Sequence, residues 1–139
     1  MIHVFYEDQS PLGEQCENVV YKTSQVPVSE GFTCGELSLI FCSDDFLLEI
    51  NKTHLDHDYY TDILTFSYNE KKTINGDLFI SLDRVRENAE SNKVEFLNEL
   101  SRVVIHGILH LCGYNDKTPE ETSLMREKES YYLKTLCFT

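Results

Sequence analysis

The chain of 139 residues has the length of one ordinary domain, and its 41% apolar content is enough to bury a core. Its 12 basic and 24 acidic residues give a formal net charge of −12, which opposes diffuse binding to nucleic acid. No apolar run approaches the ~20 residues of a membrane span, and the N-terminal stretch lacks the pattern of a secretory signal. We therefore expect a single domain over residues 1–139, located in the cytoplasm.

The first half of the chain has the patterns of strands with one helix between them. A helix over 44–52 follows the cap residue Ser43 and has acidic residues in its first turn. The polar segment 51–60 is expected to be a loop, and the turn-rich segment 69–76 predicts a hairpin between its flanking strands. Alternating apolar and β-branched residues predict four strands, over 2–6, 36–42, 62–68 and 77–82.

The second half is helical, with segments expected over 83–91, 95–112 and 119–135. The middle helix is apolar on most of its surface, so we expect it to be buried at the centre of the domain. Gly113 fits the left-handed residue that ends a helix, and Thr118 with Glu121 forms a capping box for the last helix. Strands followed by helices predict an α+β fold with a small mixed sheet covered by helices.

Two histidines on the central helix, His106 and His110, form an HxxxH pattern. Residues four apart lie one turn apart, about 5.4 Å along the axis, on the same face, where two imidazoles can chelate one metal ion. Asp116 follows the helix end at Gly113 and is placed to add a carboxylate oxygen. Two nitrogens and one oxygen, with a fourth position open to water, are typical of catalytic zinc sites.

Gly107 follows the first histidine, where the zinc peptidase pattern HExxH has a glutamate that activates water. A peptidase of that type is therefore disfavoured. Glycine within a helix costs about 1 kcal/mol relative to alanine, so we expect that a strand or a substrate approaches the helix backbone here.

The segment HGILHLCGYND (106–116) resembles the signature of the YbeY family of bacterial rRNA-maturation endoribonucleases. NKTHLDHDYYTDILTF (51–66) and NGDLFIS (75–81) are similar to two further family segments, so the resemblance covers about residues 47–130. It implies an α+β fold, one zinc ion per chain and single-strand-specific endoribonuclease activity. It also implies a role in small-subunit (16S) rRNA processing and ribosome quality control, with the small ribosomal subunit as partner and no membrane or DNA.

By position, the resemblance implies that His106 and His110 are metal ligands and that Asp116 replaces the third ligand, a histidine in the family. An aspartate oxygen binds zinc at nearly the same distance as an imidazole nitrogen. The family also carries a loop arginine implicated in activity, and its position here is Leu55, which cannot contact a phosphate. Tyr60 replaces the proline that the family has before the next threonine.

No residue stands out from the sequence as the general base. The catalytic candidates are Asp62 and Asp77, at strand ends in the matched segments, and His54. The alternative role for the two aspartates, which we favour from the sequence, is a hydrogen bond that caps a turn or helix. Candidates for substrate binding are the basic and imidazole side chains Lys52, His57, Arg84 and Arg102.

Three other functions fit the same residues. One is a non-enzymatic ribosome-assembly factor with a structural metal, which the absence of the loop arginine favours. A zinc-dependent hydrolase of small substrates suits the acidic surface, whereas a two-histidine, one-carboxylate iron oxygenase is disfavoured because its ligands usually lie on strands. An open ligand position that faces a cleft with basic residues would favour the nuclease. A metal enclosed by protein would favour the assembly factor. The metal and the oligomeric state stay open.

Overall fold

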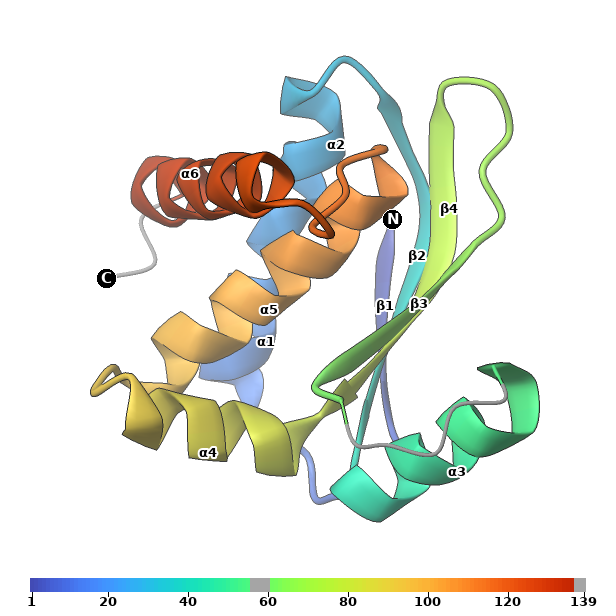
Figure 1. Ribbon diagram of the computed structural model, residues 1–139. Helices are drawn as coiled ribbons and strands as arrows, with labels where there is room; N and C mark the ends of the chain where they lie inside the picture. The colour runs from blue at the N-terminus through green and yellow to red at the C-terminus, as the bar shows by residue number, and fades with distance from the viewer. Residues whose placement is uncertain (56–60, 137–139) are drawn as a thin grey trace.

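A mixed four-stranded sheet lies at the centre of the molecule, and the computed structural model describes residues 1–55 and 61–136 (Figure 1). The strands are β1 (Ile2–Tyr6), β2 (Thr33–Cys42), β3 (Ile63–Ser67) and β4 (Thr73–Ser81). Their order in the sheet is β1-β2-β4-β3. β2 runs parallel to both β1 and β4, whereas β3 and β4 form an antiparallel pair. The predicted mixed sheet and hairpin are thus confirmed.

Most of the helices lie on one face of the sheet, and α3 lies on the other (Figure 1). The helical segments are α1 (Glu14–Tyr21), η1 (Lys22–Ser24), α2 (Gln25–Ser29), α3 (Asp44–Leu55), α4 (Leu82–Ser91), α5 (Phe96–Leu111) and α6 (Pro119–Thr135). The three helices predicted for the second half are confirmed, as are the positive φ of Gly113 and the capping box. The predicted α+β architecture is therefore correct.

The segment from α1 to α2 was not predicted from the sequence. Both helices are short, and short helices gain their stability from tertiary packing rather than from intrinsic propensity. Val20 and Val26 are fully buried against the helical face of the core. The burial of these two valines, rather than a strong helical pattern in the sequence, therefore stabilises the helical conformation of this segment.

The loop predicted over 51–60 is wrong for its first five residues, because α3 continues to Leu55. Lys52 forms an i,i+3 ion pair with Glu49, with 3.8 Å between Nζ and Oε1. Lys52 and His54 also place basic groups in the last turn, where the helix dipole favours positive charge. Residues 56–60, the rest of the predicted loop, lie outside the described residues.

The connection predicted over 69–76 is also too long, because β4 begins at Thr73 and includes Asn75 and Gly76. The Asn75 side chain accepts a hydrogen bond from the Glu36 N–H at 2.8 Å, beside a register shift in β2. A Cβ on Gly76 would lie 2.7 Å from the Phe66 carbonyl oxygen. The Asn-Gly pair therefore serves close packing inside the strand rather than a turn.

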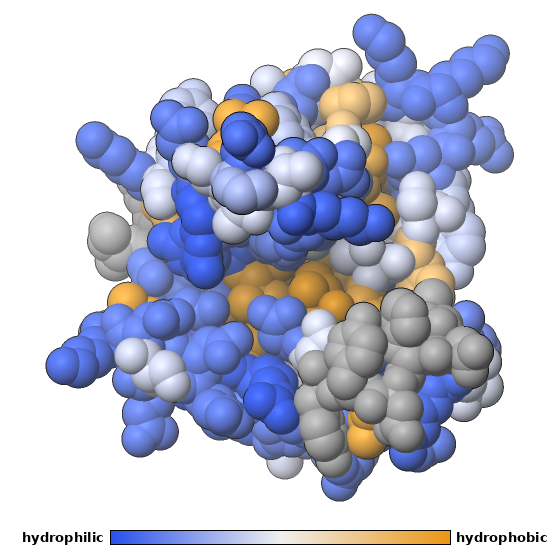
Figure 2. All heavy atoms as spheres, viewed as in Figure 1, coloured by the Kyte–Doolittle hydropathy of each residue, from blue (hydrophilic) through white to orange (hydrophobic). Residues whose placement is uncertain are grey.

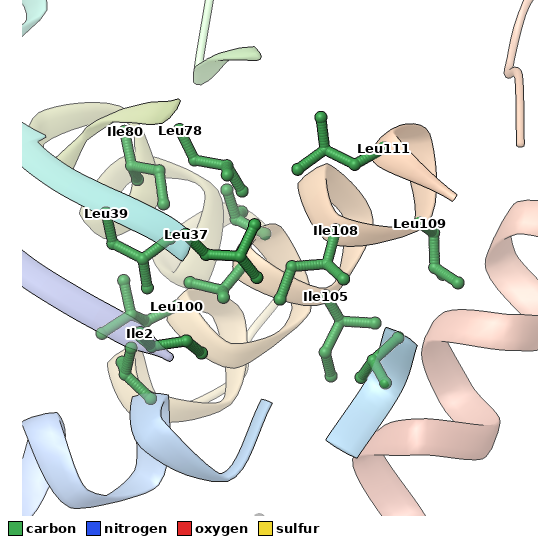
Figure 3. Packing of buried hydrophobic residues seen from close by; sticks show 14 of the residues in the cluster. Ile2, Leu37, Leu39, Leu78, Ile80, Leu100, Ile105, Ile108, Leu109 and Leu111 are labelled. Carbon is green, nitrogen blue, oxygen red and sulfur yellow. The ribbon is translucent and has the colours of Figure 1, made fainter. Parts of the chain in front are cut away.

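The main core lies between the sheet and α5. Figure 3 shows side chains of β2 and β4, such as Leu37 and Leu78, facing Ile105 and Ile108 of α5. All four of these side chains are fully buried. The predicted central, buried helix is thus confirmed.

Gly107 is the point of closest approach between α5 and the sheet. A Cβ at this position would lie 2.5 Å from Cδ2 of Leu78 and 2.6 Å from Cδ1 of Ile63. The expectation that a strand approaches the backbone here is therefore correct. Because the contact leaves no room for a methyl group, it sets the distance between the histidine-bearing helix and β3.

α3 covers one end of the opposite face of the sheet. Leu47 of this helix packs with Cys42 and Leu64 in a second, smaller apolar cluster, and Phe66 and Phe79 lie against it. Within the described ranges, we find no helix with the length and apolar content needed to cross a membrane.

We expect Gly107→Ala to lower the free energy of unfolding by about 1–3 kcal/mol, measured by urea denaturation, because overpacking outweighs the helix propensity of alanine. In a Leu78→Ala background the same substitution should cost less, since the nearer clashing atom is gone. An increase in stability on Gly107→Ala alone would contradict this account of the close contact.

Candidate metal centre

α5 and the loop that follows it bring together the three side chains predicted to bind a metal. The Nε2 atoms of His106 and His110 lie 3.0 Å apart. Oδ2 of Asp116 is 3.3 Å from His106 Nε2 and 3.4 Å from His110 Nε2. Ligands about 2.0–2.1 Å from a tetrahedral zinc ion lie about 3.3 Å from one another. The donor set and its spacing therefore fit a tetrahedral zinc site with one position left for solvent or substrate.

The loop from α5 to α6 is tied down on both sides of Asp116. Gly113 turns the chain with a φ of 107°, which an L side chain rarely adopts. The next residue, Tyr114, donates a hydrogen bond from its hydroxyl to Glu30 at 2.6 Å. The Thr122 hydroxyl donates to the Asp116 carbonyl oxygen at 3.0 Å. The aspartate is thus held in place by contacts that do not use its own carboxylate.

Glu30 joins this loop to α6. Besides Tyr114, it accepts hydrogen bonds from the Tyr132 hydroxyl and, at 3.2 Å, from Lys128 Nζ. Burial raises the pKa of Glu30, but the hydrogen bonds from Tyr114 and Tyr132 outweigh it and hold the pKa below its ordinary value. The carboxylate is therefore ionised at neutral pH and accepts all three bonds.

Glu129 is a site residue that was not predicted from the sequence. Its Oε2 lies 2.6 Å from His106 Nδ1, and its Oε1 accepts a hydrogen bond from Arg102 at 2.9 Å. It is only 2% exposed. A carboxylate on one imidazole nitrogen fixes the ring and turns the other nitrogen toward a metal. Glu129 thus orients His106 so that its Nε2 faces Asp116.

The pKa values of this pair follow from their contact. Burial lowers the pKa of His106, but the hydrogen bond to Glu129 and its negative charge outweigh burial and raise the pKa overall. Burial likewise raises the pKa of Glu129, whereas its bonds to His106 and Arg102 bring it below the ordinary value. Each group stabilises the charged form of the other.

The sequence does contain a signal for the burial of Glu129. This residue lies on the same helical stripe as the buried residues Met125, Tyr132 and Leu133.

Two clefts meet at the three-residue cluster. One has a volume of about 390 Å³ and lies between α4, α5 and α6; we call it the helical cleft. The other, of about 280 Å³, runs along β3 from Thr61 to Thr65. Asp62, His106 and Asp116 line both clefts. The side chains of His106 and Asp116 are 24% and 40% exposed, so the candidate site opens to solvent rather than being enclosed.

The other predicted catalytic residues separate into two groups. Asp62 lines both clefts, and its carbonyl oxygen accepts a hydrogen bond from the Ser81 N–H at 2.9 Å. Asp77 lies on β4 between Gly76 and Leu78, which face α5, so its side chain points to the opposite face of the sheet. His54 of α3 makes an edge contact with Phe66, whose ring belongs to the second apolar cluster on that opposite face.

The residues predicted to bind substrate are likewise dispersed. Arg102 lines the helical cleft, where it pairs with Glu129. Arg84 pairs with Asp44 at 3.1 Å between the N-terminal ends of α4 and α3, and Lys52 lies on the exposed side of α3. His57 lies outside the described residues.

The fold and this cluster define an α+β protein with a candidate three-ligand metal centre of the kind that hydrolases use. Residues 6–137 match the family model described as endoribonuclease YbeY, and the chain belongs to this family. The resemblance seen in the sequence motifs is thus confirmed. Membership indicates a nuclease family whose substrate is RNA.

Curated relatives and a solved structure agree with this placement. An endoribonuclease YbeY of Parabacteroides distasonis is 56% identical over 106 residues, which is 76% of this chain and 75% of the relative. One from Flavobacterium psychrophilum is 46% identical over 134 residues, covering 96% of this chain and 95% of the relative. The solution structure of a Thermotoga maritima protein matches with a TM-score of 0.69 and 31% identity, covering 98% of this chain and 89% of that one.

We expect Glu129→Gln to weaken zinc binding by 10- to 100-fold, because the imidazole of His106 loses its orienting carboxylate. Competition with a chromogenic chelator measures the affinity, and circular dichroism checks that the variant is folded. Glu127→Gln, on the exposed side of the same helix, is the matched control and should bind zinc like the unmodified protein. Equal affinity in both variants would contradict the orienting role.

Proposed function

We propose that this chain is a zinc-dependent, single-strand-specific endoribonuclease that acts in small-subunit (16S) rRNA processing and ribosome maturation. The observation that carries the proposal is a ligand cluster with tetrahedral spacing at the meeting point of two clefts, in a chain of an endoribonuclease family. In this proposal residues 1–139 act as one catalytic domain in the cytoplasm, with the small ribosomal subunit as partner.

His106, His110 and Asp116 are the proposed ligands of one zinc ion. Zinc at such a site polarises a phosphate oxygen and lowers the pKa of bound water toward neutrality. The negative charge of Asp116, where the family has a neutral histidine, makes that acidifying effect smaller. The exposed side of the cluster supports a substrate-facing site rather than a structural one.

Asp62 is the proposed general base. It lines both clefts together with His106 and Asp116, so its carboxylate lies beside the space where the scissile phosphate would sit. The Ser81 N–H anchors its backbone. Asp62 would accept the proton of the attacking hydroxyl, either water or the RNA 2′-hydroxyl.

Arg126 and Arg102 are the proposed phosphate contacts in the helical cleft. Arg126 is the more available, since its side chain is 64% exposed and it lies 3.5 Å from Glu129, whereas Arg102 holds Glu129 at 2.9 Å. A guanidinium group suits a phosphate because its planar donors match the phosphate oxygens.

A non-enzymatic assembly factor is the second candidate function. The observation that favours it is Leu55, at the position where the family carries an arginine implicated in activity. Such a protein would bind the metal and the ribosomal RNA without cutting it. Cleavage of single-stranded RNA by the purified protein separates the two functions.

Purified protein should contain close to one zinc ion per chain by elemental analysis, and His110→Ala and Asp116→Ala should lose both the zinc and RNA cleavage. Cys112→Ala is the control, because Cys112 lies near the ligands in sequence but outside the cluster. Its zinc content should stay unchanged. Equal zinc loss in all three folded variants would refute the ligand assignment, and full zinc without cleavage would favour the assembly factor.

Leu55→Arg should raise the rate of cleavage of a single-stranded RNA by about tenfold or more, because it restores a guanidinium group that can stabilise phosphate charge. Thr53→Arg, an exposed position on the same helix, adds the same charge and serves as the control. An equal increase in the two variants would indicate a general charge effect and contradict a specific role at position 55.

A further inference from the structure

The helical cleft extends well beyond the metal ligands. Glu99, Arg102, Val103 and His106 lie on one face of α5, because their spacings of three, four and seven residues match the helical repeat. Glu99 is therefore about 10 Å along the axis from His106. Figure 2 shows apolar surface in the hollow between α6 and α4, with hydrophilic surface on both sides.

The end of the cleft far from the metal ligands has its own set of polar groups. Asn88 and Asn92, from the last part of α4 and its C-cap, line this end together with Glu99. Glu99 is only 5% exposed, although it is a charged residue. Val103 and Met125, which are 4% and 1% exposed, add an apolar surface. A buried carboxylate beside two amides and an apolar wall is a built site rather than an ordinary solvated face.

The chemistry of this end suits a nucleobase better than a phosphate. The Glu99 carboxylate repels an anion and accepts hydrogen bonds from N–H donors. Amide side chains can donate and accept, as the edge of a base requires, and an apolar wall matches the flat face of a base. Arg102 and Arg126 both contact Glu129, which itself contacts the candidate ligand His106, so a phosphate bound by the arginines would lie beside the candidate metal ligands.

We propose that the far end of the helical cleft is a subsite for the unpaired base next to the scissile phosphate, and that Glu99 selects a base with an exocyclic amino group. The amino group donates to the Glu99 carboxylate, and Asn88 and Asn92 bond the neighbouring atoms of the base. Uracil is disfavoured because it presents a carbonyl oxygen to the carboxylate where cytosine presents an amino group. This assignment rests on the proposed nuclease function, since the base is that of its substrate.

The direction of the pKa shift of Glu99 agrees with a carboxylate that is buried from solvent. Burial raises this pKa, whereas the positive charge of Arg102 and the neighbouring Asn92 side chain lower it in part. A bound N–H donor would offset the same burial by stabilising the charged form.

Cytidine and uridine 5′-monophosphates test the subsite directly, because their bases differ mainly at the amino or carbonyl group. We expect the zinc-loaded full chain to bind cytidine monophosphate about tenfold more tightly in calorimetric titration. Glu99→Gln should reduce the ratio of the two affinities to near one, since an amide can turn to donate or accept. Glu90→Gln, on the exposed surface of α4, is the matched control and should keep the ratio.

A second variant guards against failure of Glu99→Gln to fold. Asn92→Ala changes an exposed residue and should weaken binding of cytidine monophosphate while leaving the zinc content unchanged. Equal affinity for the two nucleotides in the unmodified protein, or a preference that Glu99→Gln leaves intact, would overturn the subsite.

Cleavage of a randomised single-stranded RNA separates this inference from the proposed function. Cuts with a depletion of uracil at one position beside the scissile bond, lost in Glu99→Gln, would support both. Cuts without any base preference would refute the subsite and keep the nuclease. Nucleotide selectivity without any cutting would refute the nuclease while the base site stands.

Discussion

The contact between α5 and the sheet at Gly107 is the constraint on which the rest of the site depends. With no side chain at this position, Leu78 and Ile63 reach the helix backbone, and α5 lies close to β3. His106 and His110, on either side of the glycine, are thereby held beside the cleft that runs along β3. The residue that distinguishes this motif from HExxH therefore has a packing role, and in the proposed nuclease the general base would come from a group outside the helix.

Two carboxylates then hold the candidate ligands in place: the buried Glu129 of α6 and the half-buried Glu30 at the end of α2. Glu129 fixes the ring of His106, while Glu30 ties Tyr114 to α6 and so fixes the loop that carries Asp116. Both carboxylates are ionised at neutral pH, because their hydrogen-bond donors outweigh the effect of burial on their pKa values. The donor atoms of the three candidate ligands are consequently preorganised at tetrahedral spacing by contacts that lie outside this set.

Features that depend on local spacing could be predicted from the sequence, and features that depend on distant contacts could not. The helical spacing of His106 and His110 and the turn at Gly113 sufficed to predict that these two side chains and Asp116 lie together. Glu129 was missed because it meets His106 only after α6 folds back on α5. The Asn75-Gly76 pair was misassigned to a turn because pairing with β2 and packing under α5 override its local preference.

The charges around the cluster explain how a strongly acidic chain can present a site for RNA. The residues that line the helical cleft include two arginines against four carboxylates, namely Arg102, Arg126, Asp62, Glu99, Asp116 and Glu129. A divalent cation would bring this set to neutrality, because its charge offsets the excess of carboxylates. Zinc binding would then do more than activate a hydroxyl: it would remove the repulsion that keeps a phosphate out of the cleft. In the proposed function, metal loading and RNA binding would therefore be coupled through the same few side chains, whatever the charge on the rest of the surface.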